Sequence, residues 1–249
     1  MIRAGFWEKV RARGLAGIVK AAYRIVKAAY RRAFDNPNSY LKRVTGIIHV
    51  GANLGQEREL YAKYKLKVLW IEPLPHIFEK LRQNIREFPD QIAVNHLITD
   101  KDDAEYLFHV ADNEGMSSSI LEFAQHKDIY PGVREVSQLM LKSTTINSLL
   151  RKLGASSHSY QALIMDTQGS ELQVLKGATE HLSQFKFIKT EAADFESYVG
   201  CARVDDLTSY LVPFGFKLTR RDKFAESPSG GQYFDLLYRK RRDWRLRPP

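Results

Sequence analysis

The sequence has little cysteine and no long hydrophobic run. Cys201 is the single cysteine in 249 residues, so the chain cannot form an internal disulfide, and we expect a reducing compartment. A membrane-spanning helix needs about 18 consecutive apolar residues, and the sequence holds no run of that length. The charge-free hydrophobic segment of a secretory signal peptide is also missing. These absences predict a cytoplasmic protein without a membrane span.

The sequence also lacks the two common motifs for binding nucleotide phosphates. No Gly-Lys pair followed by Ser or Thr occurs, which excludes a P-loop of the usual type. The glycine-rich turn at residues 51–55 reads GANLG and has no third glycine at the spacing that a pyrophosphate-binding turn needs. An NAD(P)-dependent oxidoreductase is therefore disfavoured, although it stays open as an alternative.

Positive charge is concentrated at the two ends of the chain. The net charge is +9, but residues 1–34 hold nine Lys or Arg against one acidic residue, and residues 239–249 hold six against one. The intervening residues 35–238 are therefore mildly acidic. Because a protein that lies along nucleic acid needs a basic face, we expect no nucleic-acid partner for this central part.

Residues 18–24 and 25–31 are two identical copies of the sequence IVKAAYR. A seven-residue repeat keeps each residue type near one face of a helix, so residues 1–34 are predicted to form a basic amphipathic helix. Two uses of this helix remain open. It can lie on an anionic membrane surface, which would make the protein peripheral, or it can pack on its own domain or in a homodimer.

A cluster of turn-forming residues, DNPNS at residues 35–39, marks the start of the main domain. We assign residues 35–238 to this domain and residues 239–249 to a basic tail. Within the domain, apolar segments and amphipathic segments alternate along the chain. The predicted strands are residues 47–50, 68–71, 92–99, 161–165 and 185–190, and the predicted helices are residues 56–64, 76–88, 171–182 and 205–212.

This alternation predicts an α/β fold with a mostly parallel sheet and helices on both faces. Residues 215–221 and 232–238 are expected to pair as a C-terminal antiparallel hairpin. Residues 100–159 are too long for a simple crossover between parallel strands. We expect them to form an inserted region on the substrate side, with a small β element and a helix at residues 146–153.

The glycine-rich turn and Glu72 together indicate a nucleotide-type ligand. The turn follows the first strand and opens a helix, and Glu72 ends the second strand. In such βαβ units the glycines clear space for the ligand, and the carboxylate accepts hydrogen bonds from both ribose hydroxyls. S-adenosylmethionine (SAM) carries a ribose but no phosphate, so it suits this turn better than a dinucleotide does.

Ligands of open α/β sheets bind beyond the carboxyl ends of the strands, so the residues that follow each strand are the site candidates. For the cofactor these are Gly51, Ala52, Asn53, Gly55, Gln56, Glu72, Pro73 and Asp100. For the substrate they are Ser118, Gln168, Glu171 and Asp194, and for catalysis Asp166 and Glu191.

Several of these candidates have other readings that the sequence leaves open. Asn53 can cap the following helix, and Glu171 can serve only the first turn of its own helix. Asp100 can belong to a solvated turn. His49 reads as a packing histidine within the first strand, whereas His109 and His126 lie in the inserted region and cannot be placed.

No metal site is predicted. Three acidic residues at one rim can also hold Mg²⁺, and this alternative would use Asp166, Glu191 and Asp194. Nothing in their spacing demands it.

Four blocks of the sequence resemble the FkbM family of SAM-dependent methyltransferases. They are VGANLGQ, then IEPLP with LRQNI, then TTINSLL, and finally MDTQGSELQVLKGA, in the family's order between about residues 47 and 238. The resemblance implies the Rossmann-like class I methyltransferase fold, SAM as cofactor, and hydroxyl groups of sugars, glycans or natural products as acceptors. The sequence departs from the family pattern at His49 and Asn147, where the family usually carries acidic residues.

We therefore predict a SAM-dependent O-methyltransferase that acts on a small-molecule or glycan acceptor, with Asp166 as the first choice of general base. The alternative from another class is a non-catalytic membrane- or RNA-binding protein on a methyltransferase scaffold.

Overall fold

The computed structural model describes residues 36–155 and 159–241. The chain divides into two units, residues 1–43 and 44–249, and the described part of the first contains the short 3₁₀-helix η1 (Ser39–Arg43). The predicted amphipathic helix at residues 1–34 and most of the basic tail at residues 239–249 lie outside the described residues, so their membrane and dimer roles stay predictions. No helix within the described ranges is long and apolar enough to cross a bilayer.

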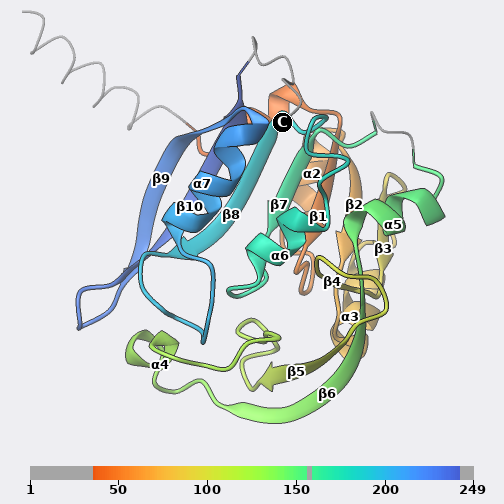
Figure 1. The fold of residues 1–249 in the computed structure, drawn as a ribbon. Coiled ribbons are helices and arrows are strands. Elements are labelled where there is room, and N and C mark those ends of the chain that lie inside the picture. The colour runs from red at the N-terminus through yellow and green to blue at the C-terminus, as the bar shows by residue number, and fades with distance from the viewer. Residues whose placement is uncertain (1–35, 156–158, 242–249) are drawn as a thin grey trace, which may run out of the picture. The chain divides into compact units, whose positions relative to one another are not determined.

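A seven-stranded sheet forms the centre of the second unit, as Figure 1 shows. Its strand order is β3-β2-β1-β7-β8-β10-β9, and the first five strands run parallel while β10 runs antiparallel to β8 and to β9. The strands are β1 (Gly46–Val50), β2 (Lys67–Ile71), β3 (Gln91–Val94), β7 (Ala162–Met165), β8 (Phe187–Ala193), β9 (Phe216–Glu226) and β10 (Gln232–Lys240). The predicted fold class and the C-terminal antiparallel hairpin are confirmed.

Helices cover both faces of this sheet. The apolar sides of α5 (Ile146–Lys152), α6 (Glu171–Lys176) and α7 (Val204–Leu211) share one hydrophobic core with the strands, and Figure 1 shows α6 and α7 in front of the sheet. On the other face, α2 (Arg58–Lys63) sets the Tyr61 ring 5.2 Å from the Trp70 ring of β2. Outside the inserted region, the second unit also contains the helical elements α3 (Pro75–Asn84) and η2 (Val212–Phe214).

The third predicted strand is wrong in its extent. Residues 92–99 do not form one strand, because the chain leaves the main sheet after Val94 and forms β4 (Leu97–Ile98) in a different sheet. The polar residue Asn95 lies at the break, where its side-chain amide donates to the backbone oxygens of Glu72 (2.7 Å) and Pro73 (3.0 Å). Asp100 therefore does not follow a strand of the main sheet.

The inserted region forms the small β element that was predicted. Its strands β5 (Glu105–Ala111) and β6 (Glu135–Thr144) form a three-stranded sheet with β4, which precedes residue 100, in the order β4-β6-β5, and α4 (His126–Ile129) lies between β5 and β6 in the chain. Figure 1 shows β5, β6 and α4 opposite the end of the main sheet where α6 begins. The core side of β5 packs Phe108 and Val110 against Leu74 and Ile77 of the α3 region, which anchors the insertion.

Helix α5 begins where the sequence departs from the family pattern. Thr145 is the N-cap, and its hydroxyl accepts a hydrogen bond from the Ser148 backbone N–H at 3.0 Å. Asn147 is the second residue of the helix, and its buried Oδ1 has no hydrogen-bond partner in the described part of the chain. The departure at residue 147 thus affects a helix start, as expected.

Candidate active site

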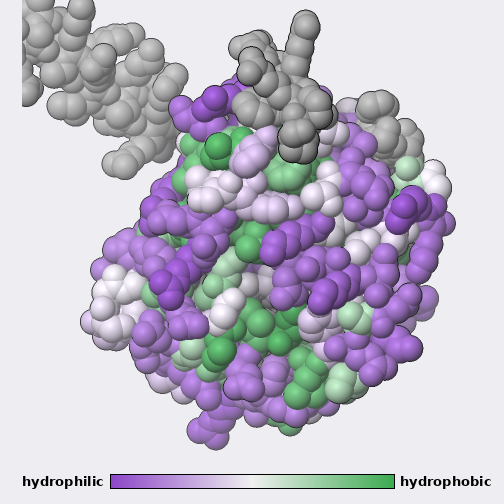
Figure 2. All heavy atoms as spheres, in the orientation of Figure 1, coloured by the Kyte–Doolittle hydropathy of each residue, from purple (hydrophilic) through white to green (hydrophobic). Residues whose placement is uncertain are grey.

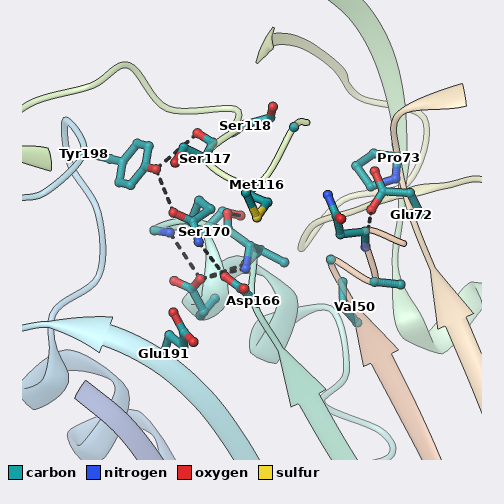
Figure 3. A pocket seen from close by; sticks show the side chains of 18 of the residues that line it. Val50, Glu72, Pro73, Met116, Ser117, Ser118, Asp166, Ser170, Glu191 and Tyr198 are labelled. Carbon is teal, nitrogen blue, oxygen red and sulfur yellow. Dashed lines mark hydrogen bonds between the residues drawn. The ribbon is translucent and has the colours of Figure 1, made fainter. Parts of the chain in front are cut away.

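A cavity of about 480 Å³ opens at the carboxyl ends of β1, β2, β7 and β8, between the sheet and the inserted region. Figure 3 shows Glu72 and Pro73 on one side of it and Tyr198 on the other, with Asp166 and Met116 between them. Most of the residues predicted from the sequence line this cavity. They are Gly51, Ala52, Asn53, Gln56, Glu72, Pro73, Ser118, Asp166, Gln168, Glu171 and Glu191.

Three predicted site residues lie outside the cavity lining. Gly55 turns away toward α3, and a β-carbon added to it would lie 2.7 Å from Cδ1 of Leu81. Asp100 lies outside the lining because the chain leaves the main sheet after Val94, at the end of β3. Asp194 accepts a hydrogen bond from the Gln232 backbone N–H at 2.7 Å and pairs with Arg221 at 3.4 Å, so its carboxylate serves the C-terminal hairpin.

Glu72 is held in place by the glycine loop and by its own chain. One carboxylate oxygen accepts from the Asn53 backbone N–H at 2.8 Å and the other from the Leu74 backbone N–H at 2.9 Å. The side chain is only 4% exposed, and burial raises its pKa to about 7 although both hydrogen bonds oppose this shift. Each oxygen keeps a further lone pair, so the carboxylate can still accept hydrogen bonds from a ligand.

The glycine loop needs a residue without a side chain at Gly51. The backbone φ there is +76°, and an added β-carbon would lie 1.9 Å from the backbone oxygen of Asp166. Asn53 makes contacts within the protein: its Oδ1 accepts from the Leu54 N–H at 2.8 Å, and its Nδ2 donates to the Glu114 backbone oxygen at 2.9 Å. The helix-cap reading of Asn53 is wrong, since the N-cap of α2 is Glu57.

Two carboxylates from neighbouring strands face the middle of the cavity. Asp166 follows β7, and Glu191 lies within β8, which runs further than predicted. Burial, together with the charge of nearby acidic groups, raises the pKa of Asp166 to about 7 and that of Glu191 to about 9. Asp166 also accepts a hydrogen bond from the Gln168 side chain at 2.6 Å. This pair can hold a cation or accept a proton.

Glu171 is buried beside this pair, but its carboxylate accepts hydrogen bonds from its own loop. Its Oε1 accepts from the Thr167 N–H at 3.0 Å, the Thr167 hydroxyl at 3.1 Å and the Gly169 N–H at 3.2 Å. Burial raises the pKa of Glu171 as well. Because one oxygen already accepts three hydrogen bonds, the arrangement favours the local reading, in which Glu171 stabilises the turn that carries Asp166.

The cavity lining contains acidic side chains and no lysine or arginine among the described residues. The nearest basic contribution to the Asp166 and Glu191 pair comes from Lys189, which is paired with Asp235 at 2.9 Å. A low-dielectric cavity with this charge pattern favours a cationic or neutral ligand over an anion. A pyrophosphate therefore fits poorly, which weighs against the dinucleotide alternative.

Aromatic side chains form the end of the cavity opposite Glu72. His126 is 3% exposed, and its ring nitrogens lie 2.7 Å from the Tyr233 hydroxyl and 3.1 Å from the Ser117 hydroxyl. Burial lowers the pKa of His126 to about 4, so the ring is neutral near pH 7. The Tyr198 hydroxyl donates to Gln168 Oε1 at 2.7 Å and approaches the Ser117 backbone oxygen at 3.1 Å (Figure 3).

His49 and His109, the other two histidines considered in the sequence, make contacts within the protein. His49 stacks on Trp70 with ring centroids 4.9 Å apart, and its Nδ1 lies 3.3 Å from the Tyr61 hydroxyl, which confirms the packing role although the residue borders the cavity. Burial lowers the pKa of His49 to about 4. His109 lies 2.9 Å from Glu135 within the small sheet and does not line the cavity.

No group of three or more His, Cys, Asp or Glu side chains is arranged to hold a metal ion in residues 36–155 and 159–241. The magnesium alternative receives no support from Asp194, because that residue lies outside the cavity.

Sequence reasoning missed the residues of the aromatic end and His96. His96 lines the cavity two residues after the end of β3, and the polar pair Asn95-His96 inside an apolar run is the signal that could have revealed it. Met116 lies in the loop between β5 and α4, Tyr198 in the loop after β8, and Phe224 and Tyr233 on β9 and β10, so no local pattern relates them.

Comparison with known proteins gives a family and one curated relative. The family model described as the methyltransferase FkbM domain matches residues 49–218. The 2-O-methyltransferase NoeI of Sinorhizobium fredii is 26% identical over 162 residues, which cover 62% of this chain and 65% of NoeI, just under two thirds of that protein.

Solved structures show similarity at low sequence identity. Magnesium protoporphyrin IX methyltransferase of Synechocystis PCC 6803 is 10% identical, with a TM-score of 0.44 over 96% of this chain and 92% of that one. TrmK of M. capricolum is 9% identical, with a TM-score of 0.45 over 82% and 66% of the two chains.

Proposed function

This chain belongs to the FkbM methyltransferase family, whose members use SAM as methyl donor, and from this premise we propose that it methylates a hydroxyl group of a sugar, a glycan or a related natural product. Two half-buried carboxylates, Asp166 and Glu191, in a cavity without lysine or arginine carry the proposal. Transfer to oxygen draws further support from NoeI, a relative described as a 2-O-methyltransferase.

The residues around the cavity fit SAM. Glu72 would accept hydrogen bonds from the ribose hydroxyls, and the turn from Gly51 to Asn53 would lie against the nucleoside, with Gln56 and Pro73 beside it. SAM is a cation that supplies a methyl group on a positively charged sulfur. The acidic lining and the carboxylates whose pKa values burial has raised suit this positive charge.

The chain's own residues then have to place the acceptor hydroxyl and take its proton. SAM would supply the methyl group to the acceptor oxygen, and the Asp166 carboxylate would take the proton that this hydroxyl loses. Glu191 accepts a hydrogen bond from the acceptor and holds it in line. General base catalysis by itself increases the reaction rate by a factor of about 10² to 10⁴. Positioning of the acceptor increases the rate further.

Replacing Asp166 with asparagine is expected to lower kcat by about 10² to 10⁴ while SAH affinity changes by less than about tenfold. Asparagine keeps an oxygen that can accept from Gln168, so the loop should stay intact, but it cannot take a proton. Steady-state kinetics and calorimetry with S-adenosylhomocysteine (SAH) measure the two effects. Asp90→Asn, on an exposed turn, is the matched control, and an unchanged kcat in Asp166→Asn would refute the role.

Affinity for SAM is expected to increase with pH between about 6 and 8, by about tenfold if one proton leaves. Burial raises the pKa of Asp166 to about 7 and that of Glu191 to about 9, so the free protein holds protons there that a bound cation displaces. The same raised values mean that the free protein loses stability as pH rises through this range. Calorimetry across pH checks the first effect, and Asp166→Asn should flatten it.

The first experiment on the function is a calorimetric titration with SAH, followed by a radiolabelled methyl-transfer screen of sugars and glycans. Micromolar binding and label on an acceptor hydroxyl are the expected results. Absence of SAH binding would refute the proposal and favour a non-catalytic scaffold, whose RNA binding would then show a steep salt dependence. If the radiolabelled methyl group appeared on a nitrogen atom of an RNA, the acceptor would be RNA and not a sugar hydroxyl.

A further inference from the structure

The C-terminal hairpin carries an irregularity at the aromatic end of the cavity. Tyr233 of β10 pairs with Ala225 of β9, whereas the next residue, Phe234, pairs with Lys223. Phe224 is therefore the extra residue of a β-bulge and faces no partner of its own. Bulges of this kind redirect a side chain and occur often beside active sites.

The bulge directs a large aromatic side chain into an open part of the cavity. Phe224 is 45% exposed although it lines the cavity, and its ring stacks on Tyr233 with centroids 5.7 Å apart. Tyr130, also in the lining, is 39% exposed, and its ring lies 6.5 Å from that of Tyr233. Figure 2, in the orientation of Figure 1, shows hydrophobic residues gathered at the lower centre of the molecule. The cavity thus offers exposed aromatic surface to a ligand.

Backbone hydrogen bonds connect the aromatic wall, which consists of Phe224, Tyr130 and Tyr233, to the main sheet. The segment before α4 donates from Ala124 and Gln125 to the backbone oxygens of Ser197 (3.0 Å) and Glu196 (3.1 Å) in the loop after β8. Tyr233 pairs with Ala193 at the end of β8, the strand that carries Glu191. The aromatic wall and the carboxylate therefore belong to one hydrogen-bonded framework.

Glu191 is available to a ligand at this place. Its carboxylate makes no hydrogen bond or ion pair with another residue in the described ranges, yet it lines the cavity, where Figure 3 shows it near Asp166. No lysine or arginine of the described lining would compensate a negatively charged ligand here. An anionic group would therefore be buried here without a positively charged side chain to pair with.

We propose that Phe224, Tyr130 and Tyr233 form the acceptor subsite for an uncharged sugar ring, which stacks on Phe224 and presents a hydroxyl group to Glu191. A sugar ring has a face of C–H groups, which suits the negative face of an aromatic ring, and hydroxyls on its edge, which suit a carboxylate. A uronic acid or a phosphorylated sugar is disfavoured, because its charge would be buried without a basic side chain to pair with it. This inference rests on the proposed function and names its substrate class.

The test compares Phe224→Ala with Phe224→Trp in the full-length protein. The acceptor probes are methyl glycosides of neutral hexoses and the matching hexuronides, and binding is followed by saturation-transfer NMR in the presence of SAH as well as by methyl transfer. Met140→Ala is the matched control, because Met140 is 62% exposed on the small sheet and outside the cavity lining.

We expect Phe224→Ala to raise the KM for the neutral glycoside by at least about tenfold without changing SAH affinity. Phe224→Trp and Met140→Ala should stay within about threefold of the wild type, and the hexuronide should bind at least about tenfold more weakly than the neutral glycoside.

The outcomes separate this inference from the function. If the wild type binds a neutral glycoside through Phe224 but transfers no methyl group, the inference stands and the proposed function falls. If the sugar is methylated with an equal KM in Phe224→Ala, or if the hexuronide is preferred, the inference falls and the function stands. A wild type that binds none of the glycosides overturns the inference.

Discussion

Glu72→Ala is expected to weaken SAH binding at least about hundredfold, a loss of about 2.7 kcal/mol. The carboxylate would provide two charge-assisted hydrogen bonds to the ribose hydroxyls, and each such bond contributes about 1.5 to 3 kcal/mol. The substitution also leaves the backbone N–H groups of Asn53 and Leu74 without their acceptor. The glycine loop then loses the contact that holds it at the cavity.

Stability should change far less than binding in this variant. Burial raises the pKa of Glu72 to about 7, so the charged carboxylate is held at a cost that alanine removes. That gain partly offsets the two lost hydrogen bonds, and we expect a net loss of about 1 kcal/mol. Urea unfolding and calorimetry measure the two quantities. Glu59→Ala on the exposed side of α2 is the control, and tight SAH binding by Glu72→Ala would disprove the assignment.

Gly51→Ala is expected to abolish SAH binding and to destabilise the fold. Its φ of +76° is strained for alanine, and the new β-carbon would lie 1.9 Å from the backbone oxygen of Asp166. Since that atom belongs to the backbone, either the glycine turn or the end of β7 must move. The movement changes the distance between Glu72 and Asp166, so the two sides of the cavity no longer match the length of the cofactor.

Gly200→Ala separates the clash from the strain. Gly200 has a similar φ of +70°, but nothing lies within 4 Å of an added β-carbon there. Both variants therefore carry the strain of a left-handed residue, about 1 to 2 kcal/mol, and only Gly51→Ala carries the clash. We expect an extra loss of about 2 to 4 kcal/mol in Gly51→Ala by urea unfolding. Equal losses in both variants would show that the turn can relax.

Much of the cofactor side could be predicted because its residues are close in the sequence. A buried strand, a glycine turn and an acidic residue after the next strand are local patterns, and parallel strands bring their carboxyl ends together. The same rule placed Asp166 and Glu191 at the cavity. It failed at Asp100, because Asn95 ends the third strand early through hydrogen bonds to Glu72 and Pro73 that no local pattern reveals.

The sequence alone determined the fold class, the family resemblance, the glycine turn and the acidic residues at the strand ends, since these follow from periodicity and from spacing along the chain. Only the tertiary structure decided the aromatic end of the cavity. The α4 segment, the loop after β8 and the bulge at Phe224 are distant in the sequence, and long-range backbone hydrogen bonds bring them together. The contacts that select an acceptor arise from that packing, which no single segment encodes.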